Sequence, residues 1–440
     1  MKYYCIGIKG SGMATLACLL SDLGYEVSGY DDTKDFKFTE KGLDARGIKI
    51  YYDGSKEIDS DTIITASKAF SEDHKEIKRI KELGFNITAY NEIIGNLTNM
   101  FRTVSVCGTH GKTTTTSMIS HIVNNTIGCN YFIGDGRGHA SKENDLFVIE
   151  SDEYNKHFLK YHPSISVCTN IELEHTECYD GLSDIINSFS MFLNSSKEYS
   201  VVCGDNENIR SITFNNKVIF YGENDNNEYI VKNIEVKEDG TYFDLYHHNE
   251  FISNIMVPVY GRHMALNACA ATIVSLNLGI DIDKIKILLK EFKNAERRFQ
   301  EERVGDSIIV DDYAHHPTEI RVTLEAAKAK YPDKDIIAIF KPNTYSRTKE
   351  FYNDFASALD IADYTYITNV DSNRERQEDY PGISSNLILE NTRNGKLLDE
   401  KEIDDLASHK GNIFVFMSCA SISHLKEDLI SKINSEVNEN

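Results

Sequence analysis

The sequence predicts an α/β protein of three domains, and three observations lead to this prediction. The chain has 440 residues, which is enough for three domains of about 150 residues each. Near the N-terminus and again near residue 100, an apolar segment runs into a glycine-rich turn and then a helical segment. Beyond residue 297, apolar segments alternate with helical ones, as in parallel sheets covered by helices. We place the domains at 1–98, 99–296 and 297–440.

The first domain begins with a βαβ unit of the Rossmann kind. A strand at 3–8 leads to a glycine-rich loop and a helix, and a second strand ends at Asp31. A dinucleotide fingerprint would have glycine where Lys9 stands. We therefore interpret the loop as a pyrophosphate-binding loop for a different nucleotide. An NAD site and simple strand–helix packing are the alternatives. Further strands are expected near 62–65 and 86–89.

The second domain opens on GTHGKTTT at 108–115, between an expected strand at 103–107 and an expected helix at 115–123. Such a turn aims backbone N–H groups and a helix N-terminus at phosphate oxygens. Lys112 would reach the terminal phosphates, and the Thr113 hydroxyl would hold Mg²⁺. Two residues separate the glycines where the common P-loop has four, so this is a shortened P-loop. A tight glycine turn without a ligand is the alternative.

Two further strands of the second domain end on side chains that suit a metal site. Glu150 follows a strand at 146–149, and His175 lies shortly after a strand at 165–169. Ligands in parallel α/β sheets bind at the carboxyl ends of strands, and Mg²⁺ prefers oxygen ligands. The alternative for His175 is a loop histidine that only donates a hydrogen bond. Residues 229–259 alternate polar and apolar side chains and predict antiparallel hairpins.

The composition of the chain limits the classes of partner that the protein is expected to bind. The formal charge of −22 argues against nucleic acid, and no apolar stretch approaches a membrane span. The nine cysteines are scattered without a CxxC pair, so we expect reduced thiols in a cytoplasmic protein and no cysteine metal site. In so acidic a chain, four cations in motifs stand out as anion-binding candidates, namely Lys9, Lys112, Arg298 and Arg347.

The third domain has expected strands at 307–310, 336–340, 364–370 and 413–417. Polar clusters follow two of these strands, DDYAHHPTE at 311–319 and KPNTYSRT at 341–348. Strand ends are the usual place for function in an open sheet. The tail from Lys426 is polar and predicts a surface helix that frays.

Taken in order, the motifs of this chain resemble those of the Mur ligase family. Within the family, the resemblance is strongest to the branch that adds L-alanine to UDP-N-acetylmuramate in low-GC Gram-positive bacteria. It extends from near residue 1 to about residue 420. The motifs are GIKGSGM (7–13), GTHGKTTT (108–115), FIGDGRG (132–138), IESDEY (149–154), TNIELEH (169–175), GRHMALNA (261–268), RRF (297–299), DDYAHHPTE (311–319) and KPNTYSRT (341–348).

The resemblance implies an ADP-forming ligase of peptidoglycan precursor synthesis. ATP would phosphorylate the lactyl carboxylate of UDP-N-acetylmuramate, and the amine of L-alanine would attack the acyl phosphate. The three domains would bind the UDP-sugar, ATP and the amino acid, in that order along the chain. The implied partners are ATP, Mg²⁺ and the two substrates, with no nucleic acid or membrane, and the protein would be a monomer or homodimer.

The motifs also supply the expected site residues. Catalysis is expected from Lys112, His175 and Arg347. ATP is expected to contact Gly108, Thr109, His110, Gly111, Lys112, Thr113, Thr114, Asn267, Arg298 and Asp312. The UDP-sugar is expected at Lys9, Gly10, Ser11, Gly12 and Asp31. The metal ligands would be Thr113, Glu150 and His175, and the amino-acid pocket would comprise Tyr313, His315, Asn343 and Arg347.

Two departures from the family pattern concern the amino-acid pocket. Asn343 stands where the family usually has histidine, and SCAS at 418–421 replaces a glycine-rich turn. A ligase for glycine or serine, or one that recycles murein peptides, is therefore an alternative. The second alternative is that the protein is not a ligase. It would then be either an NAD-dependent dehydrogenase built on residues 1–95 or a nucleotide-binding regulatory protein.

Overall fold

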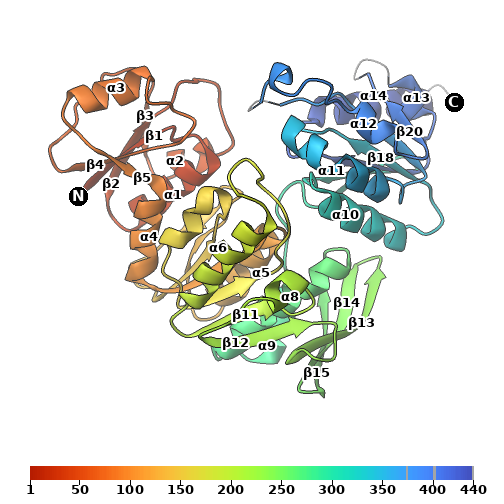
Figure 1. The fold of residues 1–440 in the computed structure, drawn as a ribbon, viewed down its shortest axis with the longest axis horizontal. Coiled ribbons are helices and arrows are strands. Elements are labelled where there is room, and N and C mark those ends of the chain that lie inside the picture. The colour runs from red at the N-terminus through yellow and green to blue at the C-terminus, as the bar shows by residue number, and fades with distance from the viewer. Residues whose placement is uncertain (373–374, 400–402, 439–440) are drawn as a thin grey trace. The chain divides into compact units, whose positions relative to one another are not determined.

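The computed structural model describes residues 1–372, 375–399 and 403–438, and Figure 1 shows its helices and strands. The strands form three sheets, of five, ten and six strands, which confirms the α/β class. Contacts divide the chain into two compact units, Met1–Val231 with Leu245–Ser253 and Asn267–Leu289, and Lys232–Asp244 with Asn254–Leu266 and Lys290–Asn440. The domain boundaries expected at 98 and 296 stay predictions.

The first sheet is parallel throughout, with the order β3-β2-β1-β4-β5. Its buried core is formed by Tyr4, Ile6, Tyr30, Ile64, Ile77 and Ile80. β1 ends two residues before the predicted end, because Gly7 and Ile8 turn and both donate to the Tyr30 carbonyl, at 2.7 and 3.1 Å. The strands are β1 (Lys2–Ile6), β2 (Glu26–Tyr30), β3 (Lys49–Tyr51), β4 (Thr62–Ala66) and β5 (Ile87–Ala89), and the helices are α1 (Ser11–Asp22), α2 (Glu40–Asp44), α3 (Lys75–Glu82) and α4 (Tyr90–Met100).

The second sheet has the order β15-β14-β13-β12-β11-β10-β6-β9-β7-β8. Its central strands are parallel. The sequences of these strands are continuous apolar runs, because both faces of the sheet are buried here. The strands are β6 (Arg102–Cys107), β7 (Asn130–Phe132), β8 (Gly138–His139), β9 (Leu146–Glu150), β10 (Ile165–Cys168), β11 (Tyr199–Cys203) and β12 (Lys217–Gly222), and the helices are α5 (Lys112–Asn124), η1 (Tyr154–Lys160), α6 (Leu182–Asn194), α7 (Glu207–Arg210), α8 (Arg262–Asn277) and α9 (Ile282–Lys290).

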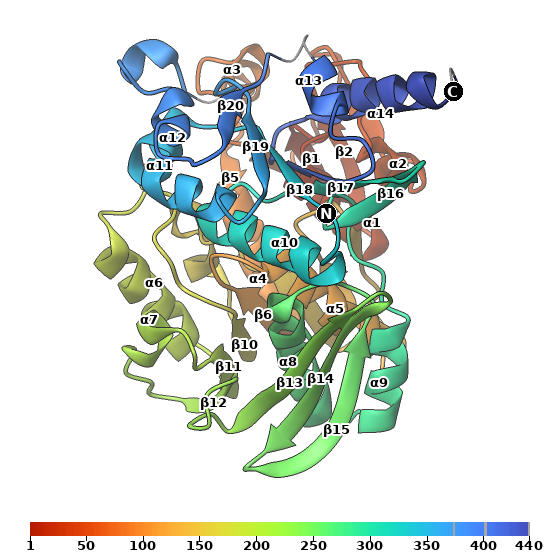
Figure 2. The ribbon, with the colours of Figure 1, turned by 90° about the vertical axis from the view of Figure 1, so that its right-hand side faces the viewer.

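Three long strands continue the second sheet beyond β12: β13 (Tyr229–Lys237), β14 (Gly240–His247) and β15 (Glu250–Val257). Figure 2 shows them side by side. Two-residue loops join them, and such short connections allow only antiparallel neighbours. The hairpins expected within residues 229–259 are confirmed.

The third sheet has the order β16-β17-β21-β18-β19-β20, with only the β16–β17 pair antiparallel among the pairings that the described residues make. Helices cover it, and α10 begins at a capping box of His316 and Glu319 with Pro317 in its first turn. The strands are β16 (Gln300–Val304), β17 (Ser307–Asp312), β18 (Ile336–Phe340), β19 (Tyr364–Ile367), β20 (Gly395–Leu397) and β21 (Ile413–Met417), and the helices are α10 (Pro317–Lys330), α11 (Tyr345–Leu359), η2 (Gln377–Asp379), α12 (Asn386–Leu389), α13 (Asp404–Ala407) and α14 (Ser423–Asn438).

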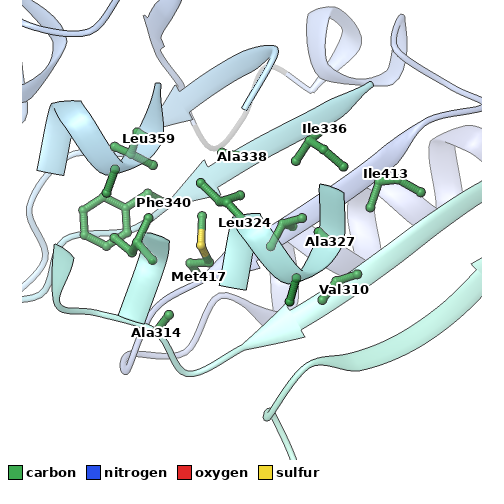
Figure 3. Close-up of a cluster of buried hydrophobic side chains, with 14 of the residues drawn as sticks. Val310, Ala314, Leu324, Ala327, Ile336, Ala338, Phe340, Leu359, Ile413 and Met417 are labelled. Carbon is green, nitrogen blue, oxygen red and sulfur yellow. The ribbon is translucent and has the colours of Figure 1, made fainter. Parts of the chain in front are cut away.

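Successive residues of β18 supply the two faces of this sheet alternately. Ile336, Ala338 and Phe340 belong to the cluster shown in Figure 3, together with Leu324 and Ala327 of α10. Ile337 and Ile339 belong to a second cluster that also holds Leu425, Leu429 and Ile433 of α14. The predicted helix is confirmed, and one apolar side of it is buried against the sheet. That its end frays stays a prediction.

None of the helices in the described part of the chain combines the length and the hydropathy needed to cross a bilayer.

Gly95 marks a close approach between α4 and η1. A Cβ at this position would lie 2.3 Å from the backbone carbonyl oxygen of Lys160. Alanine normally stabilises a helix relative to glycine by about 1 kcal/mol. Here we expect Gly95→Ala to destabilise the protein by about 1–3 kcal/mol, because the methyl group overlaps backbone. Urea-induced unfolding followed by circular dichroism measures the effect.

Asn96→Ala is the matched control, since Asn96 is an exposed neighbour on the same helix. This variant should leave the unfolding midpoint unchanged or raise it slightly. A Gly95→Ala protein as stable as the wild type would show that α4 and η1 are not packed as closely as described.

Candidate active site

The loop 108–111 lies between β6 and α5, at the carboxyl end of the central strands. Gly108 and Gly111 have φ of 138° and 81°, in the region that favours glycine. A Cβ on Gly108 would lie 2.0 Å from the Thr169 hydroxyl oxygen. The second residue after β10 holds the loop from the side. Asn170 accepts from the His110 N–H at 2.8 Å and donates to the His110 carbonyl at 3.0 Å.

Helix α5 begins at Lys112, three residues earlier than predicted. The Thr115 N–H makes the first bond of the helix, to the Gly111 carbonyl at 3.0 Å. The N–H groups of the preceding turn have no acceptor within a helix, and the helix dipole adds positive potential there. The turn that carries Lys112, Thr113 and Thr114 is therefore suited to bind an anion.

The Lys112 ammonium is held inside this loop. It donates to the carbonyls of Gly108 and Thr109 at 2.6 and 3.0 Å, and to Oε1 of Glu153 at 2.8 Å. Burial by itself lowers the pKa of Lys112, but the Glu153 carboxylate outweighs this effect, and the pKa lies above its ordinary value. The ammonium therefore stays charged at neutral pH.

His175 shares the same carboxylate. Its Nε2 lies 3.3 Å from Oε1 of Glu153, and the residue has φ of 53°. Burial alone lowers its pKa, but Glu153, Glu177 and Glu174 overcome the effect and raise the pKa to about 9. An imidazole must lose its proton to ligate a metal. The structure thus shows His175 as a hydrogen-bond donor to Glu153, and its metal role stays a prediction.

The other two predicted metal ligands lie together. The Thr113 hydroxyl donates to Oε1 of Glu150 at 3.0 Å. The other carboxylate oxygen accepts from the Gly134 N–H at 2.7 Å. A hydroxyl and a carboxylate beside the phosphate-binding turn are hard oxygen ligands, so this donor set fits Mg²⁺.

Asn267 in α8 reaches the same loop from far along the chain. A Cβ on Gly111 would lie 2.9 Å from Oδ1 of Asn267, so this side chain is packed against the turn. The structure brings together the loop 108–114, Glu150, His175 and Asn267, all within one compact unit.

The N-terminal loop is built differently. Gly10 caps α1, which begins at Ser11, and Gly12 faces the Tyr90 hydroxyl, which a Cβ would approach to 2.6 Å. The Lys9 side chain is buried, and its ammonium lies 2.9 Å from Glu40 and 3.1 Å from the Asp35 carbonyl. Asp31 accepts from the Lys9 N–H at 3.1 Å. Lys9 and Asp31 therefore shape the loop from inside the protein.

In the other compact unit, β17 ends at Asp312, and Tyr313 follows it. The buried Asp312 carboxylate accepts from the N–H groups of Phe299 and Ala314 at 2.7 and 2.8 Å. Burial raises the pKa of Asp312 to about 6, although Arg298 and these N–H groups oppose the rise. The Arg298 guanidinium lies over the Tyr313 ring, 5.0 Å from its centroid.

The remaining predicted pocket residues occupy two neighbouring segments of this unit. Nδ1 of His315 lies 2.9 Å from the Tyr313 carbonyl and 3.1 Å from Glu319. Arg347, in the first turn of α11, donates to Oδ1 of Asn343 at 3.0 Å. The replacement of histidine by asparagine at 343 therefore gives Arg347 an acceptor.

Sequence reasoning missed three residues that organise these groups: Glu153, Asn170 and Glu375. Glu153 lies within the motif IESDEY and Asn170 within TNIELEH, but neither spacing reveals their partners. Glu375 accepts from the N–H groups of Tyr345 and Ser346 at 2.6 and 3.1 Å, and so caps α11. Its loop carries no motif, and only the folded chain reveals it.

Comparison with known proteins agrees with this geometry. The model described as "Mur ligase family, catalytic domain" matches residues 2–102. The models described as "Mur ligase middle domain" and "Mur ligase, glutamate ligase domain" match residues 106–275 and 297–410.

Two relatives named UDP-N-acetylmuramate–L-alanine ligase match almost the whole chain. The one from Lactiplantibacillus plantarum is 38% identical over 96% of both chains. The one from Lactococcus lactis subsp. lactis is 36% identical over 99% of both.

Solved structures share the fold at lower identity. A UDP-N-acetylmuramate–alanine ligase from Thermotoga maritima has a TM-score of 0.80 at 22% identity, covering 99% of this chain and 100% of the other. A murein peptide ligase from Psychrobacter arcticus has a TM-score of 0.68 at 20% identity, covering 98% of both. These two structures show that the fold is shared. The three family models and the 38% and 36% identity to the two ligases, over nearly the full length, establish the relationship: the chain belongs to the Mur ligase family.

Proposed function

We propose that this protein is an ATP-dependent, ADP-forming ligase that joins L-alanine to the lactyl carboxylate of UDP-N-acetylmuramate in peptidoglycan precursor synthesis. The names of its relatives from Lactiplantibacillus plantarum and Lactococcus lactis support this reaction. The observation that carries the proposal is the charged, partly buried Lys112 ammonium at the start of α5, where a helix N-terminus faces the same turn. A fixed cation at that place is what transfer of a phosphoryl group requires.

The proposed reaction has two steps. A lactyl carboxylate oxygen attacks the γ-phosphorus of ATP, and ADP leaves, which gives an acyl phosphate. The amine of the amino acid then attacks the acyl carbon, loses a proton, and inorganic phosphate leaves as the amide forms. Lys112 and the N–H groups of α5 stabilise the charge that develops on the transferred group. Thr113 and Glu150 would hold Mg²⁺, which neutralises phosphate charge when bound.

We assign the UDP-sugar to the N-terminal loop through its backbone. Gly10, Ser11 and Gly12 begin a twelve-residue helix whose N-terminus suits a pyrophosphate. Lys9 and Asp31 remain part of the proposed site as residues that fix the loop, since their side chains are engaged within the protein.

We assign the amino acid to the segments that hold Tyr313, His315, Asn343 and Arg347. Arg347 presents a planar guanidinium, which pairs with both oxygens of a carboxylate. Because Arg347 already donates to Asn343, the identity of residue 343 bears on the orientation of the guanidinium. A preference for glycine or serine is therefore the second candidate function.

The first test concerns Lys112. Lys112→Ala should lower turnover by about 10³-fold or more, because this cation opposes the negative charge that develops in phosphoryl transfer. Phosphate release from ATP with UDP-N-acetylmuramate and L-alanine measures the loss. Lys160→Ala, which removes an exposed lysine of the same unit, should keep wild-type turnover. A folded Lys112→Ala enzyme with near-normal turnover would contradict the assignment of the phosphate loop.

The second test concerns amino-acid recognition. With ATP and UDP-N-acetylmuramate present, a panel of twenty amino acids should give the fastest phosphate release with L-alanine. Arg347→Ala should raise the Michaelis constant for the amino acid at least tenfold, since loss of a desolvated charge pair typically costs about 2–5 kcal/mol. Arg347→Lys should recover only part of the lost affinity for the amino acid, because an ammonium cannot reproduce the two parallel hydrogen bonds of the planar guanidinium.

Two further variants complete this comparison. Arg393→Ala removes an arginine that pairs with Asp360 at 3.2 Å, and it should leave all three Michaelis constants unchanged. Asn343→His should shift the preference toward L-alanine if the natural substrate is glycine or serine. If Arg347→Ala instead weakens only the binding of the UDP-sugar, the amino-acid pocket lies elsewhere.

The third test concerns the N-terminal loop. Calorimetry on the whole protein should detect UDP-N-acetylmuramate and give no heat of binding with NAD, because Lys9 stands where a dinucleotide loop needs glycine. Ser11→Asp places a negative charge at the N-terminus of α1 and should weaken UDP-sugar binding by repelling its pyrophosphate. Micromolar binding of NAD would revive the dehydrogenase interpretation.

A further inference from the structure

Two histidines and a glutamate meet at one end of the β14–β15 hairpin. His247 ends β14, His248 begins the loop that leads to β15, and Glu228 immediately precedes β13. Nε2 of His247 lies 3.2 Å from Oε1 of Glu228, and Nε2 of His248 lies 4.0 Å from the same oxygen. The three ligand atoms all lie within 4.8 Å of one another. The proposed reaction uses none of these residues.

The surrounding backbone fixes where these three residues lie. The Glu228 N–H donates to the Phe220 carbonyl at 3.0 Å, and the His248 N–H donates to the Glu228 carbonyl at 2.9 Å. The His247 ring stacks on Tyr229, with centroids 4.3 Å apart and planes at 21°. The loop itself is a two-residue turn in which His248 and Asn249 have φ of 48° and 66°. The cluster is therefore a consequence of strand pairing.

The spacing of the donors suits a transition-metal ion. Bonds of about 2.0–2.2 Å in a tetrahedral zinc site place neighbouring donors roughly 3.3–3.5 Å apart. The contact of His247 with Glu228, at 3.2 Å, is just below this spacing. His248 must close a slightly longer gap, and its side chain is 69% exposed and therefore able to turn. Two imidazoles with one carboxylate favour Zn²⁺ over Mg²⁺ or Ca²⁺, and the charge of −22 favours any cation.

We propose that Glu228, His247 and His248 form a Zn²⁺ site, with water completing the coordination on the exposed side. The bound ion ties the tip of the β14–β15 hairpin to the start of β13. Because the ion binds the folded arrangement, it stabilises the protein by mass action. The competing interpretation is a simple ion pair between histidine and glutamate, which has no need of zinc.

The test compares the wild-type protein with the double variant His247→Phe, His248→Asn. Phenylalanine keeps a ring on Tyr229, and asparagine tolerates the left-handed conformation at 248, so the variant removes both nitrogen ligands and preserves the turn. Chelator-treated full-length protein is titrated with Zn²⁺ in excess Mg²⁺, which occupies the oxygen-ligand site. The wild type should bind one more equivalent of Zn²⁺ than the variant. Zinc should also raise the Tm of the wild type by several degrees more than it raises the Tm of the double variant.

Two single variants sharpen the comparison. His139→Ala removes an exposed histidine that lies 3.6 Å from the Asp22 carboxylate but belongs to no such cluster among the described residues. It should retain the full zinc stoichiometry, whereas Glu228→Gln should weaken zinc binding roughly tenfold or more. Equal zinc stoichiometry and equal Tm shifts in the wild type and the double variant would overturn the proposal. If the double variant does not fold, His248→Asn alone provides the same comparison.

Discussion

The carboxylate of Glu153 is the interaction on which the phosphate loop depends. One oxygen accepts from both the Lys112 ammonium and the His175 imidazole, at 2.8 and 3.3 Å. A buried lysine without a counter-ion would lose its proton. The Glu153 carboxylate thus keeps Lys112 and His175 charged, and the Tyr179 hydroxyl fixes the backbone beneath them by donating to the Glu153 carbonyl at 2.5 Å.

The two glycine-rich loops of the chain use lysine in opposite ways. Lys112 is at the first position of a helix and lies in the turn that faces the anion site. Lys9 lies before the capping residue of its helix and is buried against Glu40, with Tyr52 beneath its ammonium at 4.9 Å. A loop that already contains an internal ion pair can present neutral backbone to its ligand. This difference suits the role proposed for the N-terminal loop, which is to hold a nucleotide without acting on it.

Much of this architecture could be predicted from local signals. The apolar runs at 103–107 and 336–340 became strands because each fills both faces of a sheet, and GTHGKTTT became a strand–loop–helix unit as expected. The burial of α14 was also present in the sequence, since Leu425, Leu429 and Ile433 recur at helical spacing. The polar residues between them concealed that pattern.

What could not be predicted were contacts made by distant segments. The partner of Lys9 is Glu40 because the segment after β2 folds back over the loop. Glu375 caps α11 from a loop with no motif. Such pairs depend on where in the fold a loop comes back into contact with another segment. The periodicity of side chains along the sequence does not encode that position.

The contact between Gly108 and Thr169 also limits how this protein can change over generations. A Cβ at 108 would meet the threonine hydroxyl at 2.0 Å, while that hydroxyl supports the loop by donating to the His110 carbonyl at 2.5 Å. Shortening residue 169 would remove that support without making room at 108, because a Cβ there would still lie 3.2 Å from the backbone nitrogen of Thr169, at a φ of 138°. Substitution at 108 is therefore opposed by the backbone, and substitution at 169 by the loss of the hydroxyl that holds the loop.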